Sequence, residues 1–339
     1  MECGVRSAEC GMTSVKRVLA VMMFACVILT IAGCADSGIS PASNDNVYSS
    51  SGNTISSSGS VSSSDAADSG SGSTAPVRSD NVNEWEIRIA DKAGNVLWRF
   101  TESELRLLEP ERTEMLSYTY STVNNWPAPR FYVANGYSVS SILRAAGAFD
   151  SARTVTFLAA DGYGVSLTRE QLFAEQYCFP HVNEDPEDAA PVQPMIAFRW
   201  REGAEDIGEI RDDKPIFIFG QRTPFEHTNP AFVVGVAEII IDDSECEVWQ
   251  TATTFPEPGE IDVGETVKLQ HPAFGLVKMY YTLDGSDPTA FSTMYNPSTY
   301  QPELNRPILI SAPTTIRVLV TGYGKNDSEI AVFEFIPLP

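Results

Sequence analysis

Short segments after residue 84 alternate apolar and polar positions, which is the pattern of a half-buried β-strand. The first covers residues 85–89, and a Lys-Ala-Gly-Asn turn at 92–95 separates it from a second strand at 96–100. This arrangement predicts that the folded region begins with a β-hairpin. Later apolar runs predict buried strands at 155–158, 196–200, 216–219 and 232–241.

Capping residues predict three short helices in the same region. Two of them follow the pattern Thr-x-x-Glu/Gln, in which the first side chain and the one three positions later cap the helix N-terminus. The helix starts are at Thr101, Ser138 and Thr168, and Gly147 ends the second helix. Strands and helices alternate here without a βαβ rhythm, so we expect an α+β domain over 83–250.

Helical periodicity disappears after about residue 254. Short β-rich runs then alternate with turns of Gly, Pro, Asn and Asp, a pattern typical of a small β-sandwich over 254–339. In one strand, Tyr280 and Thr282 share one face and Tyr281 lies on the other. The expected strands lie at 266–269, 278–282, 308–310, 315–320 and 330–336.

The N-terminus has the order of a secretory signal. Lys16 and Arg17 precede an apolar run at 18–31, and small residues then lead to Cys34. The final Ile-Ala-Gly-Cys resembles the lipobox of bacterial lipoproteins. The resemblance implies that residues 1–33 are cleaved as a signal peptide and that acyl chains on Cys34 anchor the protein to the membrane. An ordinary signal with an incidental cysteine is the alternative.

Residues 34–82 are a low-complexity segment rich in Ser, with Gly, Asn, Asp and Thr. This composition is typical of a flexible, disordered linker. A chain of this length reaches roughly 35–40 Å on average. The linker is therefore long enough to hold a folded domain away from a bilayer.

The C-terminal segment carries a specific motif, which begins with Met-Tyr-Tyr-Thr-Leu-Asp-Gly-Ser-Asp-Pro at 279–288. The motif continues at 307–308, 314–318, 322–324 and 327–329. These residues resemble the chitobiase/β-hexosaminidase C-terminal domain over about 255–337. The resemblance implies an accessory immunoglobulin-like sandwich that is not catalytic. An exposed Tyr281 is then a candidate glycan contact, and packing of the tyrosines against neighbouring strands is the alternative.

Four segments of the preceding region match another family in order and spacing, at 139–147, 155–163, 216–220 and 234–241. Together they resemble the molybdopterin-binding domain of the sulfite oxidase type. The resemblance implies a molybdenum-ligating cysteine before the first matching helix, but the corresponding segment 118–126 contains none. Ser117 and Ser121 offer only hydroxyl oxygens, which are poorer ligands for a soft metal than a thiolate. We therefore expect no bound cofactor, with molybdopterin as the alternative.

The charge balance narrows the class of partners. The 339 residues include 45 Asp and Glu against 23 Lys and Arg, which gives a formal net charge of −22. Such acidity favours solubility and disfavours nucleic acid or anionic lipid as a partner. Besides Cys34, the mature chain keeps Cys178 and Cys246, which form either one disulfide or two free thiols. No Cys/His spacing of a metal site occurs.

One polar cluster stands beside a predicted strand end, and it comprises Arg222, Glu226, His227 and Asn229. Loops at strand ends often carry binding sites, so we expect a ligand pocket there. A structural loop whose polar groups bind one another is the alternative. The expected pocket residues are Asn124, Tyr163, Arg222 and His227.

Together these features predict a lipid-anchored protein on the extracytoplasmic face of the cell membrane, with no assigned catalytic residue and no metal site. Its first predicted role is the binding of a small ligand, a cell-surface glycan or another protein. Two alternatives remain. One is a molybdopterin-type oxidoreductase with an unusual or lost metal ligand, and the other is a carbohydrate-binding accessory protein that acts through the C-terminal sandwich.

Overall fold

The computed structural model describes residues 84–108, 113–180 and 188–338. The predicted signal peptide, Cys34 and the serine-rich linker at 34–82 lie outside these residues. All described residues belong to one compact unit, Thr74–Pro339. Within the described ranges, no helix has both the length and the apolar composition needed to cross a membrane.

Strands dominate the described residues. They take up 46% of them, against 11% for helices of all kinds. The α-helices are short: α1 (Glu102–Leu107), α2 (Val139–Ala145) and α3 (Arg169–Phe173). The predicted α+β class is therefore wrong, because the protein is mostly β and its described residues show no distinct α+β domain of the molybdopterin-binding type.

The error comes from two long strands that the sequence pattern does not reveal. β3 (Met115–Val123) and β4 (Pro129–Ser138) pair antiparallel along their whole length. The last four residues of β3 are all buried, so both of its faces are covered there and the alternation of apolar and polar residues is lost. Its Ser, Thr and Tyr residues suggest a polar loop, although Thr and Tyr favour strands when they pack against neighbours.

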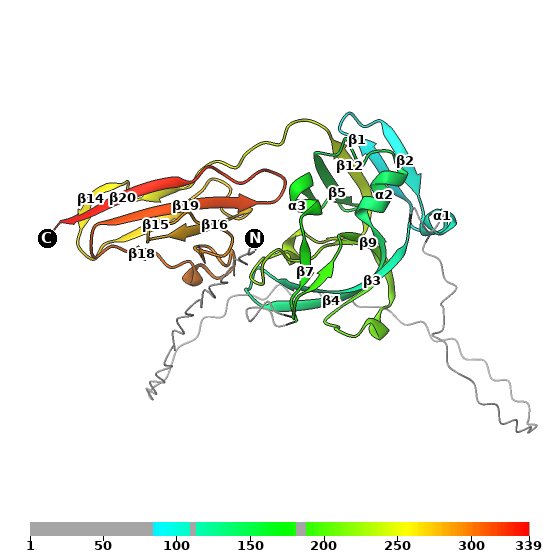
Figure 1. The fold of residues 1–339 in the computed structure, drawn as a ribbon, viewed down its shortest axis with the longest axis horizontal. Coiled ribbons are helices and arrows are strands. Elements are labelled where there is room, and N and C mark those ends of the chain that lie inside the picture. The colour runs from blue at the N-terminus through cyan, green and yellow to red at the C-terminus, as the bar shows by residue number, and fades with distance from the viewer. Residues whose placement is uncertain (1–83, 109–112, 181–187, 339) are drawn as a thin grey trace, which may run out of the picture. The chain divides into compact units, whose positions relative to one another are not determined.

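Two five-stranded sheets form residues 84–242, which we call the first β region (Figure 1). One sheet has the order β2-β1-β12-β5-β6, with β1 and β12 parallel, and the other has the antiparallel order β11-β10-β9-β4-β3. A small pair, β7-β8, contacts β3 of the second sheet. The bounds are β1 (Ile87–Asp91), β2 (Val96–Phe100), β5 (Thr154–Ala159), β6 (Gly164–Thr168), β7 (Gln176–Cys178), β8 (Ala190–Val192), β9 (Met195–Glu202), β10 (Asp212–Ile218), β11 (Val233–Val234) and β12 (Val236–Asp242).

Local sequence signals locate most of these elements correctly. The hairpin of β1 and β2 and the strands β5, β9 and β10 lie where the apolar pattern predicts them. All three helices begin directly after their predicted capping residues. The strand expected at 232–241 is instead broken into β11 and β12 at Gly235, whose φ of +74° suits glycine.

The two sheets of the first β region pack around one apolar core. Phe157 of β5 stacks on Phe217 of β10 with ring centroids 3.5 Å apart, and both side chains are fully buried. Ile89 and Ile239 contribute from the first sheet and Ile196 from the second. Full burial of each such side chain stabilises the fold by about 1.5–3 kcal/mol relative to exposure.

Residues 253–338 form two more sheets, β13-β15-β18 and β14-β20-β19-β16-β17, which we call the C-terminal sandwich. Leu269, Met279, Val318 and Phe335 meet in its own apolar cluster. All five predicted strands are present, and the pattern missed only the short β13, β14 and β17. The bounds are β13 (Thr253–Phe255), β14 (Gly259–Asp262), β15 (Thr266–Gln270), β16 (Val277–Thr282), β17 (Thr293–Met294), β18 (Ile308–Leu309), β19 (Thr314–Gly322) and β20 (Ala331–Leu338). The predicted division near residues 250–254 stays a prediction.

Candidate ligand-binding cavity

Loops and strand ends of the first β region meet strands of the C-terminal sandwich around a cavity of about 510 Å³, which we call the junction cavity. The first β region contributes the turn between β5 and β6 and the loop after β10. The C-terminal sandwich contributes β16, the segment after it and the turn after β19. Side chains from parts of the chain far apart in sequence therefore line one space.

Three of the four residues expected in a pocket line this cavity, namely Tyr163, Arg222 and His227. The fourth, Asn124, does not, and its neighbour Asn125 does. The Asn124 carboxamide oxygen instead accepts hydrogen bonds from the backbone N–H groups of Trp126 at 2.9 Å and Ala128 at 3.0 Å. Asn124 therefore holds the turn between β3 and β4.

Arg222 is held by Glu226 on the same loop. Its guanidinium donates to Glu226 Oε1 from Nη2 at 2.5 Å and from Nε at 3.0 Å, and its backbone N–H donates to Oε2 at 2.6 Å. Asn229, the last member of the predicted polar cluster, donates to the Tyr132 hydroxyl at 2.8 Å. Within this cluster, Arg222, Glu226 and Asn229 thus bind protein groups, as the structural alternative expected.

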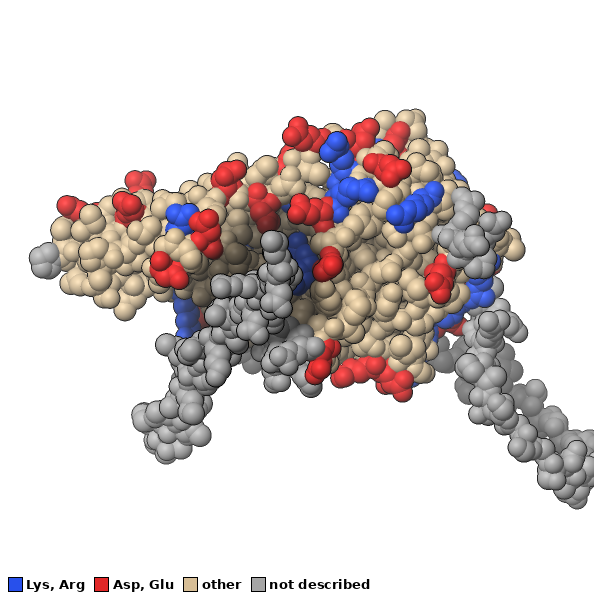
Figure 2. Space-filling view, viewed as in Figure 1, with Lys and Arg blue, Asp and Glu red and all other residues tan. Residues whose placement is uncertain are grey.

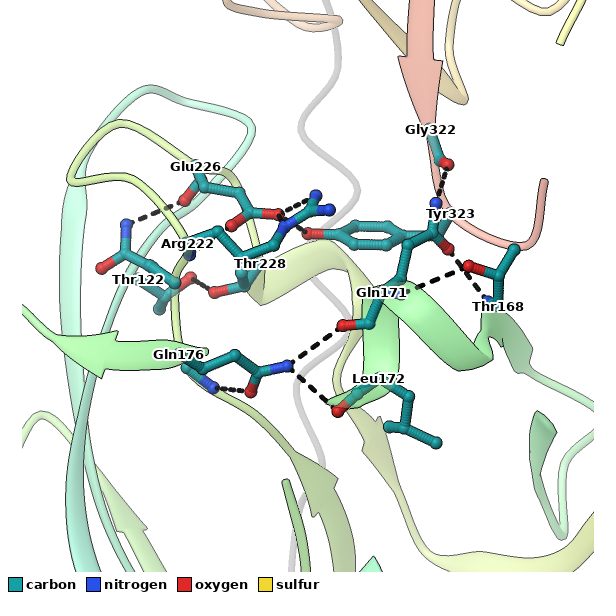
Figure 3. Close-up of polar contacts among 12 residues, drawn as sticks. Thr122, Thr168, Gln171, Leu172, Gln176, Arg222, Glu226, Thr228, Gly322 and Tyr323 are labelled. Atoms are coloured by element: carbon teal, nitrogen blue, oxygen red, sulfur yellow. Dashed lines mark hydrogen bonds and ion pairs between the residues drawn. The ribbon is translucent and has the colours of Figure 1, made fainter. Parts of the chain in front are cut away.

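Tyr323 reaches this loop from the turn after β19 (Figure 3). Its hydroxyl donates to Glu226 Oε1 at 3.2 Å, and its ring meets the edge of Phe219 with centroids 5.6 Å apart. Burial, and then the Glu226 carboxylate, raises the pKa of Tyr323 well above its ordinary value. The phenol therefore stays protonated and remains a hydrogen-bond donor.

Gln171 joins the two β regions at a second point (Figure 3). Its Nε2 donates to the carbonyl oxygens of Gly322 at 2.8 Å and Lys325 at 2.9 Å. Its Oε1 accepts from the backbone N–H of Thr168, as part of the α3 capping box, and also from that of Gly324, both at 3.0 Å. One side chain therefore caps a helix and forms hydrogen bonds with the turn after β19.

His227 and Thr223 bring polar atoms without hydrogen-bond partners to the lining. Both residues are buried, with 8% and 3% of their surface exposed. Nδ1 of His227 and Oγ1 of Thr223 have no partner among the residues that the structure describes. Burial, assisted by the charge of Lys278, lowers the pKa of His227 to about 3. His227 is therefore neutral near pH 7.

Lys278 is a lining residue that the sequence did not indicate. Its Nζ donates to the backbone carbonyl oxygens of Asn296 at 3.2 Å and Pro297 at 3.3 Å. Burial lowers the pKa of Lys278 to about 8. Alternation along β16 gives the only available signal, because it places Lys278 on the same strand face as Tyr280.

Tyr281 lies on the opposite face of β16 from Tyr280, as predicted. Tyr280 lines the junction cavity, whereas Tyr281 packs against the apolar cluster of the sandwich and meets Tyr295 edge to face at 6.5 Å. Burial raises the pKa of Tyr281. The structure thus places the candidate glycan contact away from the cavity and in partly buried packing.

The segment expected as a metal-ligand loop is largely strand β3. Ser121 is fully buried, and its hydroxyl donates to Gln221 Oε1 at 2.6 Å and accepts from the backbone N–H of Phe179 at 2.7 Å. Cys178 and Cys246 are both free thiols. In the described part of the chain, no three His, Cys, Asp or Glu side chains gather as a metal site.

A comparison with known protein families gives a match within the C-terminal sandwich. Residues 267–335 match a family model described as Fn3 associated. This match and the packed sheets together support an immunoglobulin-like β-sandwich for the C-terminal region. No curated protein sequence matches the chain.

Proposed function

We propose that this chain is a membrane-anchored extracytoplasmic lipoprotein that binds a small organic ligand in the junction cavity without transforming it. The volume and lining of the cavity support the ligand-binding part of this proposal. Its volume of about 510 Å³ lies within the roughly 300–1,000 Å³ usual for small-molecule sites. Such sites combine mostly apolar walls with a few polar groups that fix the ligand's orientation.

The walls have this composition. Tyr163, Leu276 and Phe291 line the cavity and keep 48%, 74% and 70% of their surface exposed. Exposed apolar side chains gathered around a hollow mark a binding surface more often than isolated ones do. The unpartnered polar atoms of His227 and Thr223 supply hydrogen-bonding capacity that the described protein groups do not use.

Gly275 offers a direct test, because it lines the cavity and an added Cβ would meet nothing within 4 Å. Gly275→Trp should fill part of the cavity, whereas Gly275→Ala should leave it open. We would screen the purified protein against metabolites and oligosaccharides by thermal shift and confirm each ligand by calorimetry. We expect Gly275→Trp to weaken binding at least tenfold and Gly275→Ala to leave it unchanged. Equal binding by both variants, or no ligand at all, would refute the site.

The membrane anchor needs a separate experiment. Cells expressing the full chain would be labelled with a radioactive fatty acid and fractionated. We expect label and membrane association for the natural sequence and loss of both for Cys34→Ala. Cys178→Ala is the matched control, because it removes a buried cysteine of the folded region and should keep the label. Unchanged labelling of Cys34→Ala would contradict the lipoprotein assignment.

A second candidate function is carbohydrate binding at an aromatic platform, which would agree with the resemblance of the sandwich to the chitobiase/β-hexosaminidase C-terminal domain. Trp126 and Tyr300 stack with centroids 5.6 Å apart and an interplanar angle of 11°, and 57% and 62% of their surfaces are exposed. Flat exposed rings of this kind suit the apolar face of a sugar. Binding on a glycan array that Tyr300→Ala abolishes and Tyr281→Ala preserves would support this function, and the reverse pattern would exclude it.

A further inference from the structure

We infer that the ligand of the junction cavity carries a carboxylate that binds the Lys278 ammonium group. This inference rests on the proposed function and names the chemical class of the ligand. It starts from the charges in the cavity lining: Lys278 and Arg222 are cationic side chains there, and Glu226 and Asp327 are carboxyl side chains.

Arg222 and Glu226 neutralise each other, since they form an ion pair at 2.5 Å. Lys278 forms no ion pair with a carboxylate among the described residues. Two carbonyl oxygens accept hydrogen bonds from its ammonium group, which has three protons to donate. Asp327 lines the same cavity but forms no ion pair with Lys278, whose pKa is lowered by burial without a contribution from any carboxylate. Lys278 is therefore a partly buried cation with no carboxylate partner among the described residues.

An uncompensated charge of this kind costs free energy, because burial removes water that would otherwise solvate it. A carboxylate placed beside Nζ would offset that cost with a charge-assisted hydrogen bond. One cation matches one negative charge, so a monoanionic carboxylate fits better than a doubly charged phosphate. The neutral His227 and the free Thr223 hydroxyl then serve the uncharged polar groups of the ligand.

The chain that surrounds this cation carries more acidic than basic side chains. Acidic side chains are spread over the face shown in Figure 2, and the sequence carries a net charge of −22. Long-range attraction therefore does not draw anions to this protein. Selection of a carboxylate must come from a local contact, and Lys278 in the cavity supplies it.

The first test compares ligands that differ only in charge. Calorimetry would measure glucose against glucuronate, galactose against galacturonate, and benzamide against benzoate. We expect the carboxylate of a pair to bind at least tenfold tighter than its neutral partner. Preference among uronates indicates an acidic sugar as the source of the carboxylate, and preference for benzoate indicates a free organic acid.

The second test changes Lys278. Lys278→Met keeps most of the unbranched side chain and removes its charge, so it should weaken carboxylate binding about 10- to 100-fold and leave the neutral probes unchanged. Lys278→Arg should retain most of the binding. Lys268→Met, at an exposed position on β15, is the matched control and should bind as the natural protein does.

A third measurement needs no substitution. Reductive methylation with formaldehyde and borohydride, followed by mass spectrometry, reports how accessible each lysine is, and a bound carboxylate should slow the modification of Lys278 but not that of Lys268. If both members of every pair bind equally well and Gly275→Trp still blocks binding, the carboxylate inference is wrong but the cavity remains the binding site. Failure of every probe and of the wider screen would overturn both.

Discussion

The hydroxyl of Tyr323 donates a hydrogen bond of 3.2 Å to Glu226 Oε1, across 97 positions of sequence. The same carboxylate holds Arg222. A residue of the C-terminal sandwich therefore completes the loop of the first β region that lines the junction cavity. The geometry of the cavity depends on both parts of the chain at once.

Substitution of Tyr323 should separate its two roles. Tyr323→Phe removes one hydrogen bond and should lower the free energy of unfolding by about 1 kcal/mol. Tyr323→Ala also removes the ring that packs on Phe219 and should cost about 2–4 kcal/mol. Urea denaturation followed by tryptophan fluorescence measures both. Tyr300→Phe, at an exposed position, should change stability by less than about 0.5 kcal/mol, and equal losses for Tyr323→Phe and Tyr323→Ala would show that the ring contact contributes nothing.

Gln171 should control how strongly the two β regions unfold together. Gln171→Ala removes four hydrogen bonds, two of which the side chain donates to Gly322 and Lys325. We expect a loss of about 2–4 kcal/mol, since each such bond contributes about 1 kcal/mol. Calorimetry should show one transition for the natural protein and a broadened or split transition for Gln171→Ala. Glu170→Ala, one position earlier, should keep the single transition, and an unchanged profile for Gln171→Ala would contradict the coupling.

The buried ion pairs of Glu102 should contribute more to the free energy of unfolding than an exposed ion pair does. Glu102 is fully buried and binds Arg106 at 2.7 Å and Arg199 at 2.6 Å. Glu102→Gln removes the buried anion that Arg106 and Arg199 share, although Arg199 keeps its ion pair with Asp212 at 2.9 Å, and should cost about 3–5 kcal/mol. Glu86→Gln breaks an exposed pair with Arg99 and should cost less than about 1 kcal/mol. Chemical denaturation measures the loss of unfolding free energy in both variants. Losses of similar size would contradict this prediction.

His227 should make stability depend on pH. Its pKa is about 3 in the folded chain, against an ordinary value of 6.5. As the pH falls from about 6.5 to 3, the unfolded chain takes up a proton that the folded chain does not, so stability is lost. The loss is on the order of a few kcal/mol, because one pKa unit corresponds to about 1.4 kcal/mol. His227→Gln should lose less stability than the natural protein between pH 7 and pH 4 in urea denaturation, and parallel losses would contradict the assignment.

Part of the candidate site follows from sequence. Tyr163, Arg222 and His227 stand in turns and loops at strand ends, where binding residues concentrate, and all three line the junction cavity. The sequence does not mark Lys278 as a site residue, because it is one polar position within a strand and nothing local distinguishes it from a solvent-facing lysine. Its environment depends on a loop of the first β region and on the chain after Tyr295, which only folding brings together.

The sequence by itself determined the elements whose causes are local. Thr101 and Thr168 cap helices through partners three residues away, and alternation located most strands, because both signals act within a few residues. Tertiary structure decided the mostly β class, since the burial of both faces of β3 depends on distant strands. It also turned Tyr281 toward the sandwich core and left Lys278 in the cavity without a carboxylate partner in the part of the chain that the structure describes. Those outcomes depend on packing between segments far apart in the chain, which no local pattern encodes.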